Sequence, residues 1–207
     1  MRPHKVESMS VFFATASIAC FIYALLALLL LHVLRPDYAP IHHMISEYAV
    51  GPYGWVMTTF FLATSCGCLM LLLGLVGSGP SVAVARIGTL LLAVASIGLV
   101  VSAIFPMDVR LPLTRSGAIH DMSFMVNIGS ILLAMVLLSV SFGSEPRWRA
   151  YRPTSLMLAG LAILAAILQF LTLHRGAPYG LTNRLAVTVL FTWLLATSIR
   201  LRAVARI

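Results

Sequence analysis

Six apolar runs, each close to or beyond the length needed to cross a bilayer, constrain this chain more than any other feature. A helix needs about 20 mostly apolar residues to span the hydrocarbon core, where every backbone polar group must be bonded within the protein. The runs therefore predict an all-α integral membrane protein with a bundle of six transmembrane helices. We expect the spans at about residues 9–34, 54–76, 87–105, 119–142, 155–173 and 185–199.

The composition agrees with a single multi-pass domain. Only 10% of the 207 residues are charged, whereas a soluble domain is about a quarter charged. The six spans and their short loops occupy the whole of residues 1–207, so we expect one transmembrane domain and no separate soluble one. The first run is too long for the core of a signal peptide and is expected to be retained.

The basic residues predict an orientation. The net charge of +8 comes mostly from arginines in short loops and at both ends, a distribution typical of membrane topology and not of a nucleic-acid surface. Nine Lys or Arg fall on the side of the two termini and five on the other side. Since positively charged loops tend to stay in the cytoplasm, both termini are expected there. Five of six histidines and four of six acids lie on the other, outer side, where we expect any chemistry.

The second outer loop carries the first candidate residue, Asp108. It follows Pro106, and a proline tends to end the helix before it, so the carboxyl group is expected near the membrane interface. Partial burial there would raise its pKa and allow it to donate a proton. A solvated acid paired with Arg110 or Arg115 is the competing interpretation.

The fourth span is expected to open with His120 and Asp121. Phe124 and Asn127 follow His120 by four and seven residues, which places these three on one helix face. An amide two turns into a membrane must face the protein interior or water, so this face is predicted to point inward. A general base, a structural hydrogen-bonding group and a metal ligand are all open roles for His120, and the non-metal roles are favoured. The helix dipole alone explains Asp121.

The first outer loop holds a second cluster of polar residues. His42 and Ser46 are four apart, as are His43 and Glu47, which suits a short helical turn. Glu47 is the second candidate acid. A solvated amphipathic loop lying on the lipid headgroups is the competing interpretation.

Polar residues near the last two spans complete the candidate set. Gln169, near the end of the fifth span, is expected to point inward. Thr182 is a reasonable N-cap for the sixth span, and Asn183 follows it. Arg184 is either a side chain that extends to the interface or a clamp for an anionic group.

These segments together resemble a known family. The sequences HHMISEYAVGPYGW, IFPMD and GLTNR, the arginine that opens the third span, and the glycine before His120 are similar to the bacterial and archaeal membrane family catalogued as domain of unknown function 998. The resemblance covers most of the chain, from the first span to the sixth. It implies a six-helix protein of a prokaryotic plasma membrane, and it brings no established activity with it.

The leading hypothesis is an enzyme that acts on a lipid-like or isoprenoid substrate by acid–base chemistry. Asp108 or Glu47 would protonate an epoxide or alkene, His120 would take part as a further catalytic residue, and aromatic faces would stabilise the cation, in broad analogy to membrane terpene cyclases. No cofactor or metal is expected, and the expected partners are the hydrophobic substrate and membrane lipids, not nucleic acid. Expected substrate contacts are His43, Ser46, Tyr48, Trp55, Phe105, Phe124, Asn127, Gln169, Asn183 and Arg184.

Two other classes of function stay open. One is a lipid hydrolase or transferase, either zinc-dependent or metal-free; the zinc-dependent form would resemble membrane ceramidases, which use Ser, Asp and His around zinc. This chain offers those residue types without a recognisable ligand spacing: Ser46, Asp108, His42, His43, His120 and His174. A transporter or partner subunit is the third class, and charges confined to one face argue against a transport path. No oligomeric state is predicted.

Overall fold

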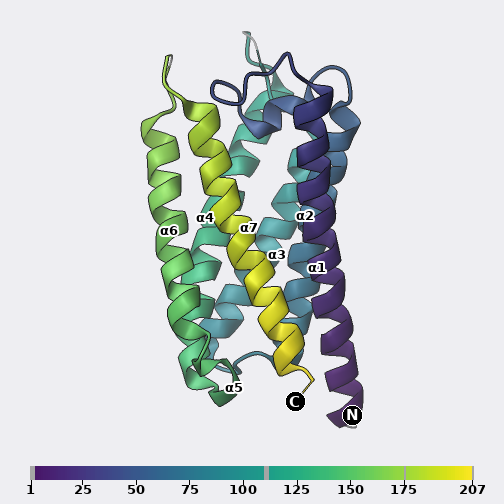
Figure 1. Cartoon of the computed structure of the whole chain (residues 1–207), viewed down its shortest axis with the longest axis vertical. Helices are drawn as coiled ribbons and strands as arrows, with labels where there is room; N and C mark the ends of the chain where they lie inside the picture. The colour runs from purple at the N-terminus through teal and green to yellow at the C-terminus, as the bar shows by residue number, and fades with distance from the viewer. Residues whose placement is uncertain (1–2, 110–111, 175, 207) are drawn as a thin grey trace.

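The computed structural model describes residues 3–109, 112–174 and 176–206, and these residues form an all-helical bundle (Figure 1). Six of the helices are long and apolar enough to cross a membrane, which confirms a multi-pass integral membrane protein. The short element η1 overlaps the helical turn expected in the first outer loop, whereas the short elements η2 and α5 were not predicted. The elements are α1 (Pro3–Leu34), η1 (Ile45–Ala49), α2 (Gly54–Ser78), α3 (Ala83–Ile104), α4 (Arg115–Ser141), η2 (Phe142–Ser144), α5 (Pro146–Arg149), α6 (Arg152–Leu171) and α7 (Tyr179–Val204).

The six long helices pack as a closed ring. Each contacts its neighbours in the order α1, α2, α3, α4, α6 and α7, and α7 returns to α1. Both termini lie at one end of the bundle (Figure 1). We call the opposite end the loop end; it is built from residues 35–53, 105–114 and 172–178, of which 110, 111 and 175 lie outside the described residues.

Small residues allow the helices to approach closely. A Cβ atom on Gly67 of α2 would lie 2.6 Å from the ring of Phe21 on α1. Beside it, the Ser17 hydroxyl donates across the same contact to the Gly67 carbonyl, at 2.9 Å. Close backbone approach and hydroxyl hydrogen bonds are how membrane helices associate when lipid provides no hydrophobic driving force between them.

Five of the six long helices begin earlier than predicted, and in α4 and α7 this changes the place of candidate residues. α4 begins at Arg115, with Thr114 as N-cap accepting from the Gly117 amide at 3.1 Å. His120 and Asp121 therefore lie in the second turn, and the first-turn placement of Asp121 was wrong. α7 begins at Tyr179, so Thr182 is not the N-cap: its hydroxyl donates to the Tyr179 carbonyl at 3.1 Å. Hydropathy detects only the apolar part of a helix and misses a polar first turn held by neighbouring loops.

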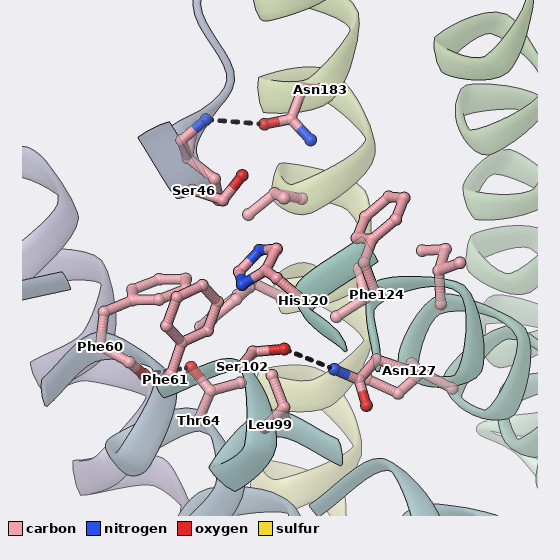
Figure 2. A pocket seen from close by; sticks show the side chains of 16 residues that line it. Ser46, Phe60, Phe61, Thr64, Leu99, Ser102, His120, Phe124, Asn127 and Asn183 are labelled. Atoms are coloured by element: carbon pink, nitrogen blue, oxygen red, sulfur yellow. Dashed lines mark hydrogen bonds between the residues drawn. The ribbon is translucent and has the colours of Figure 1, made fainter. Parts of the chain in front are cut away.

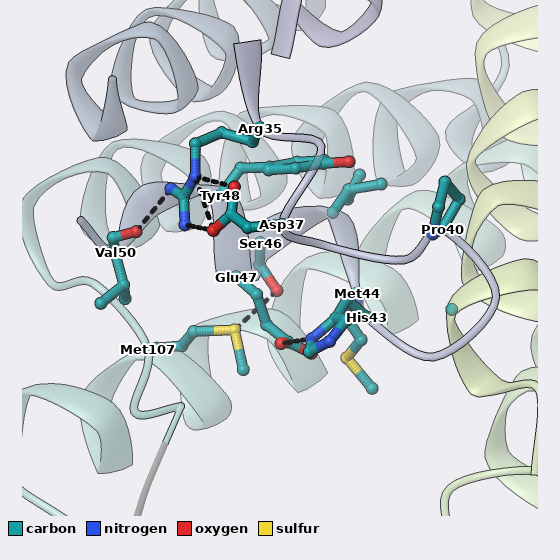
Figure 3. Close-up of polar contacts among 12 residues, drawn as sticks. Arg35, Asp37, Pro40, His43, Met44, Ser46, Glu47, Tyr48, Val50 and Met107 are labelled. Atoms are coloured by element: carbon teal, nitrogen blue, oxygen red, sulfur yellow. Dashed lines mark hydrogen bonds and ion pairs between the residues drawn. The ribbon is translucent and has the colours of Figure 1, made fainter. Parts of the chain in front are cut away.

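The buried guanidinium of Arg35 organises the first loop of the loop end (Figure 3). Its Nε and Nη2 donate to the Asp37 carboxylate at 2.8–3.2 Å. Its Nη1 donates to the carbonyls of Val50 and Pro52, at 2.8 and 3.0 Å. The chain turns beside it at Gly51, whose φ of 86° suits glycine. Arg35 thus joins the start of the loop to its end.

This ion pair predicts that the first loop loosens in acid. Hydrogen bonds from Arg35 hold the pKa of the exposed Asp37 carboxyl below its ordinary value of 3.8. A lowered pKa in the folded state stabilises the fold above the unfolded value, and this stabilisation is lost as the pH falls below 3.8 through the folded pKa. We expect pepsin to cleave the loop of Asp37→Asn faster than that of wild type above this range, and equally fast below it. A difference that persists at the lowest pH would contradict the assignment.

Candidate functional site

A cavity of about 100 Å³ lies inside the loop-end half of the bundle, between α2, α3, α4, α7 and η1 (Figure 2). We call it the inner cavity. Its wall is mostly apolar and includes four phenylalanine rings. The lining residues are Ile45, Ser46, Phe60, Phe61, Thr64, Leu99, Ser102, His120, Phe124, Asn127, Ile128, Ile131, Asn183, Val187, Leu190 and Phe191.

His120 is the titratable residue of the inner cavity, and its tautomer is determined by a backbone contact. The side chain is 4% exposed, and Nδ1 lies 2.8 Å from the Phe105 carbonyl oxygen. A carbonyl only accepts, so Nδ1 must carry the hydrogen, and Nε2 of the neutral ring is an acceptor. In the described part of the chain no protein group hydrogen bonds to Nε2. The imidazole therefore offers the cavity an oriented proton acceptor.

A chain of hydroxyl groups runs from His120 to Asn127 and fixes the amide of Asn127. The Ser123 hydroxyl donates to the His120 carbonyl at 2.8 Å, so the Ser102 hydroxyl, 2.7 Å away, must donate to Ser123. Ser102 can then only accept, and it accepts from Nδ2 of Asn127 at 3.3 Å. Oδ1 of Asn127 has no hydrogen-bond partner among the described residues. It lies against Gly98 of α3, where a Cβ atom would overlap it.

The short helix η1 forms the roof of the inner cavity. Asn183 of α7 holds it in place, since its Oδ1 accepts from the Ile45 amide at 3.0 Å. The Ser46 hydroxyl donates to Sδ of Met107 at 2.9 Å, which ties the roof to the loop that follows α3 (Figure 3). Two loops and one helix must therefore come together to close the cavity.

A second hollow of about 390 Å³ lies on the other side of η1, and we call it the vestibule. Its acid–base pair is His43 and Glu47: His43 Nδ1 lies 2.6 Å from Glu47 Oε2 (Figure 3). Glu47 is 5% exposed, and its Oε1 also accepts from the Met44 amide at 2.9 Å. The contact follows the four-residue spacing read from the sequence. The vestibule is lined by His43, Met44, Glu47, Met107, Asp108, Val109, Leu173, His174 and Tyr179.

Asp108 has a structural task at the start of α4. Its two oxygens accept from the Thr114 amide at 2.6 Å and the Thr114 hydroxyl at 2.9 Å. Gly117 leaves room for this contact, because a Cβ there would lie 3.1 Å from that of Asp108 and overlap its carboxylate. Of the two arginines considered as its partner, Arg110 lies outside the described residues. Asp108 lines the vestibule and not the inner cavity.

Arg184 holds the first loop against α1 and α7. Its Nη1 donates to the carbonyls of Pro40, His43 and Gly180, at 2.7, 2.6 and 2.9 Å. Its Nε donates to Nε2 of His32 at 2.8 Å, and its Nη2 to the Tyr48 hydroxyl at 3.2 Å. With five protein acceptors around it, the guanidinium acts here as a clamp on the chain itself. Tyr48 is buried beneath it and lines neither hollow.

Three other predicted substrate contacts lie away from the inner cavity. Trp55 is 68% exposed on the outside of α2. Phe105 reaches the site through its carbonyl group, which holds His120, and its ring is absent from the lining. Gln169 is buried on α6 as expected, but it lines neither hollow.

The residue types considered for zinc do not converge. His120 faces the inner cavity, whereas His43 and His174 face the vestibule on the other side of η1. Across the described ranges, no three His, Cys, Asp or Glu side chains are grouped as metal ligands would be. This donor arrangement does not fit a three-ligand catalytic zinc site.

Ser102, Ser123 and Gly98 were not predicted from the sequence as part of this site. Ser102 and Gly98 lie four residues apart in α3, on the face that meets Asn127. Both are small residues within an apolar span, a pattern that marks helix contacts in membranes generally and does not single out a site.

One protein family matches most of this chain, including all residues that line the two hollows. The family model described as Protein of unknown function (DUF998) matches residues 17–200, from within α1 almost to the end of α7. The chain belongs to this family. The match confirms the resemblance seen in the sequence, and every lining residue of the inner cavity and the vestibule lies inside the matched DUF998 region. Searches of the curated proteins and of the solved structures found no match.

Proposed function

We propose that this protein is a membrane-embedded enzyme that acts on a lipid-like or isoprenoid substrate by acid–base chemistry in the inner cavity. The observation that carries the proposal is His120: a nearly buried imidazole, oriented by the Phe105 carbonyl, with Nε2 open to an apolar cavity. An apolar cavity with a few oriented polar groups in its wall is a candidate binding or reactive site.

The proposed setting is a prokaryotic plasma membrane, with both termini in the cytoplasm and the loop end outside. The division of nine basic residues against five supports this orientation. The vestibule would then open to the outer membrane face, and the inner cavity would lie at the depth of the outer leaflet.

The proposed reaction is a protonation followed by proton loss, which leaves an isomer of the substrate. The proton for an alkene or epoxide would be supplied from the vestibule, where the Glu47–His43 pair lies on the other side of η1. Nε2 of His120 would then remove a proton from the resulting cation in the inner cavity. The phenylalanine faces of the wall, among them Phe60 and Phe124, would stabilise that cation. Asp108 takes no part in this proposal, because Thr114 engages both of its oxygens.

The size of the inner cavity limits the reaction to one end of a long molecule. Its volume of about 100 Å³ is below that of the roughly 150 Å³ cavity that admits benzene. A complete isoprenoid chain is much larger. The proposal is therefore a reaction at a terminal unit, in contrast to a cyclisation that folds the whole chain.

Replacing His120 by Asn tests the catalytic assignment. The Asn Nδ2 can replace Nδ1 as donor to the Phe105 carbonyl, whereas the acceptor at Nε2 is lost. Membranes containing wild-type protein are expected to accumulate an apolar product with the mass of its precursor and a different retention time. The variant should form it at least about 100-fold more slowly. The measurement is chromatography with mass spectrometry of lipid extracts.

The matched control is Asp121→Asn, which changes the exposed neighbour of His120 in the sequence. This variant should form the product at the wild-type rate. Identical lipid profiles from wild type and His120→Asn, with both proteins folded, would refute the proposed enzyme.

A further inference from the structure

Two polar atoms of the inner cavity have opposite hydrogen-bonding roles, and backbone contacts determine both. Nε2 of His120 is an acceptor, because Nδ1 must donate to the Phe105 carbonyl. Asn183 supplies the donor. Its Oδ1 accepts from the Ile45 amide, so the remaining amide atom is Nδ2, which carries two hydrogens.

Both residues are buried, and both atoms lack a hydrogen-bond partner among the described residues. His120 and Asn183 are each 4% exposed and face the cavity from α4 and α7. Figure 2 shows the Asn183 nitrogen turned away from the hydrogen bond that its oxygen accepts. In the described part of the chain no acceptor hydrogen bonds to this nitrogen. Both residues line the cavity, and polar groups inside a protein are normally paired with protein, water or ligand, so this donor and this acceptor together point to a ligand that completes them.

The rest of the wall selects against a charged ligand. All sixteen lining residues are uncharged when His120 is neutral, and most are apolar. The other hydroxyls are already engaged: Thr64 donates to the Phe60 carbonyl at 2.7 Å, and Ser46 donates to Met107. A phosphate, carboxylate or ammonium group would therefore lose its hydration without gaining an opposite charge.

We propose that the inner cavity binds the neutral hydroxyl end of an apolar molecule, such as an isoprenoid or fatty alcohol. The hydroxyl hydrogen donates to Nε2 of His120, and the hydroxyl oxygen accepts from Nδ2 of Asn183. The first few carbons lie against Phe60, Phe61 and Phe124. This assignment names the substrate class of the proposed function and rests on that proposal in this respect. In that reaction the hydroxyl must release Nε2 of His120 before Nε2 can take the proton from the cation.

The test compares geraniol with geranyl methyl ether. The ether keeps the chain and the oxygen but has no hydrogen to donate. Binding is measured by native mass spectrometry of the protein in detergent, as the fraction carrying one ligand over a concentration series. We expect wild type to bind the alcohol about tenfold more tightly, because the ether leaves Nε2 buried and unpaired. Equal affinity for the two compounds in wild type overturns the proposal.

Two variants test whether the preference for the alcohol over the ether depends on Nε2 of His120. His120→Asn keeps the donor to Phe105 and removes the cavity acceptor, so it should bind the alcohol and the ether alike. Thr64→Val is the matched control on the same wall, because its hydroxyl is already bonded to Phe60; its preference should equal that of wild type. A preference that survives in His120→Asn, or is lost in Thr64→Val, also contradicts the assignment.

Measurements of ligand binding and of product formation distinguish a failure of this inference from a failure of the proposed enzyme. Alcohol selectivity in wild type without any product in membranes would support the hydroxyl site and refute the enzyme. Product formation that depends on His120, with equal binding of alcohol and ether, would support the enzyme and refute the hydroxyl site.

Discussion

Replacing Gly98 by Ala should destabilise the bundle by about 1–3 kcal/mol, the usual cost of overpacking a closely packed core. A Cβ atom at this position would overlap Oδ1 of Asn127 and lie 2.9 Å from its Cγ. Either α3 and α4 move apart, or the amide leaves Ser102 and breaks the hydroxyl chain to His120. The thermal midpoint of the detergent-solubilised protein, followed by circular dichroism, measures the loss.

Two further variants show whether Asn127 is the cause. Gly129→Ala is the matched control, since a Cβ atom at this position on α4 would meet nothing within 4 Å, and alanine favours a helix over glycine. Its midpoint should equal or exceed that of wild type. Adding Asn127→Ala to Gly98→Ala should restore most of the loss, because the overlapping group is gone. A Gly98→Ala midpoint equal to that of wild type would refute this packing.

Replacing Arg184 by Ala should release the first loop and lower the stability by roughly 3 kcal/mol, since hydrogen bonds to a charged donor contribute about 1.5–3 kcal/mol each and water can replace some of them. The carbonyls of Pro40 and His43 lose their donor, and Tyr48 loses its hydroxyl contact. Thermal midpoints and the rate of proteolysis within residues 39–53 measure the effect.

Lysine should rescue Arg184→Ala only in part. An ammonium group cannot reproduce the planar fork that reaches His32, the loop carbonyls and Tyr48 at once. Arg115→Ala, at an exposed position on the first turn of α4, is the control and should keep wild-type stability and protease resistance. If Arg184→Ala resists protease as wild type does, the loop is held by other contacts.

The inward face of α4 was predicted correctly from spacing alone. His120 and Asn127 are 4% and 7% exposed, and both line the inner cavity. The prediction succeeded because helical geometry relates residues four and seven apart, and because an amide in lipid needs a polar or protein environment. The ranges of the spans were less accurate, since polar first turns such as that of α7 carry no hydropathy signal.

The sequence by itself determined the number of spans and the buried face of α4, because apolar length and helical period are local properties of the chain. Only the tertiary structure decided which partner each polar group takes. Arg184 donates to a carbonyl 144 residues away, and Asn183 accepts from an amide 138 residues away. The separation of the inner cavity from the vestibule also depends on such contacts, because η1 is held between α7 and the loop after α3. Hydrogen-bond partners depend on distances in the folded chain, which residue spacing cannot supply. These long-range contacts place His120 in the inner cavity and Asp108 outside it.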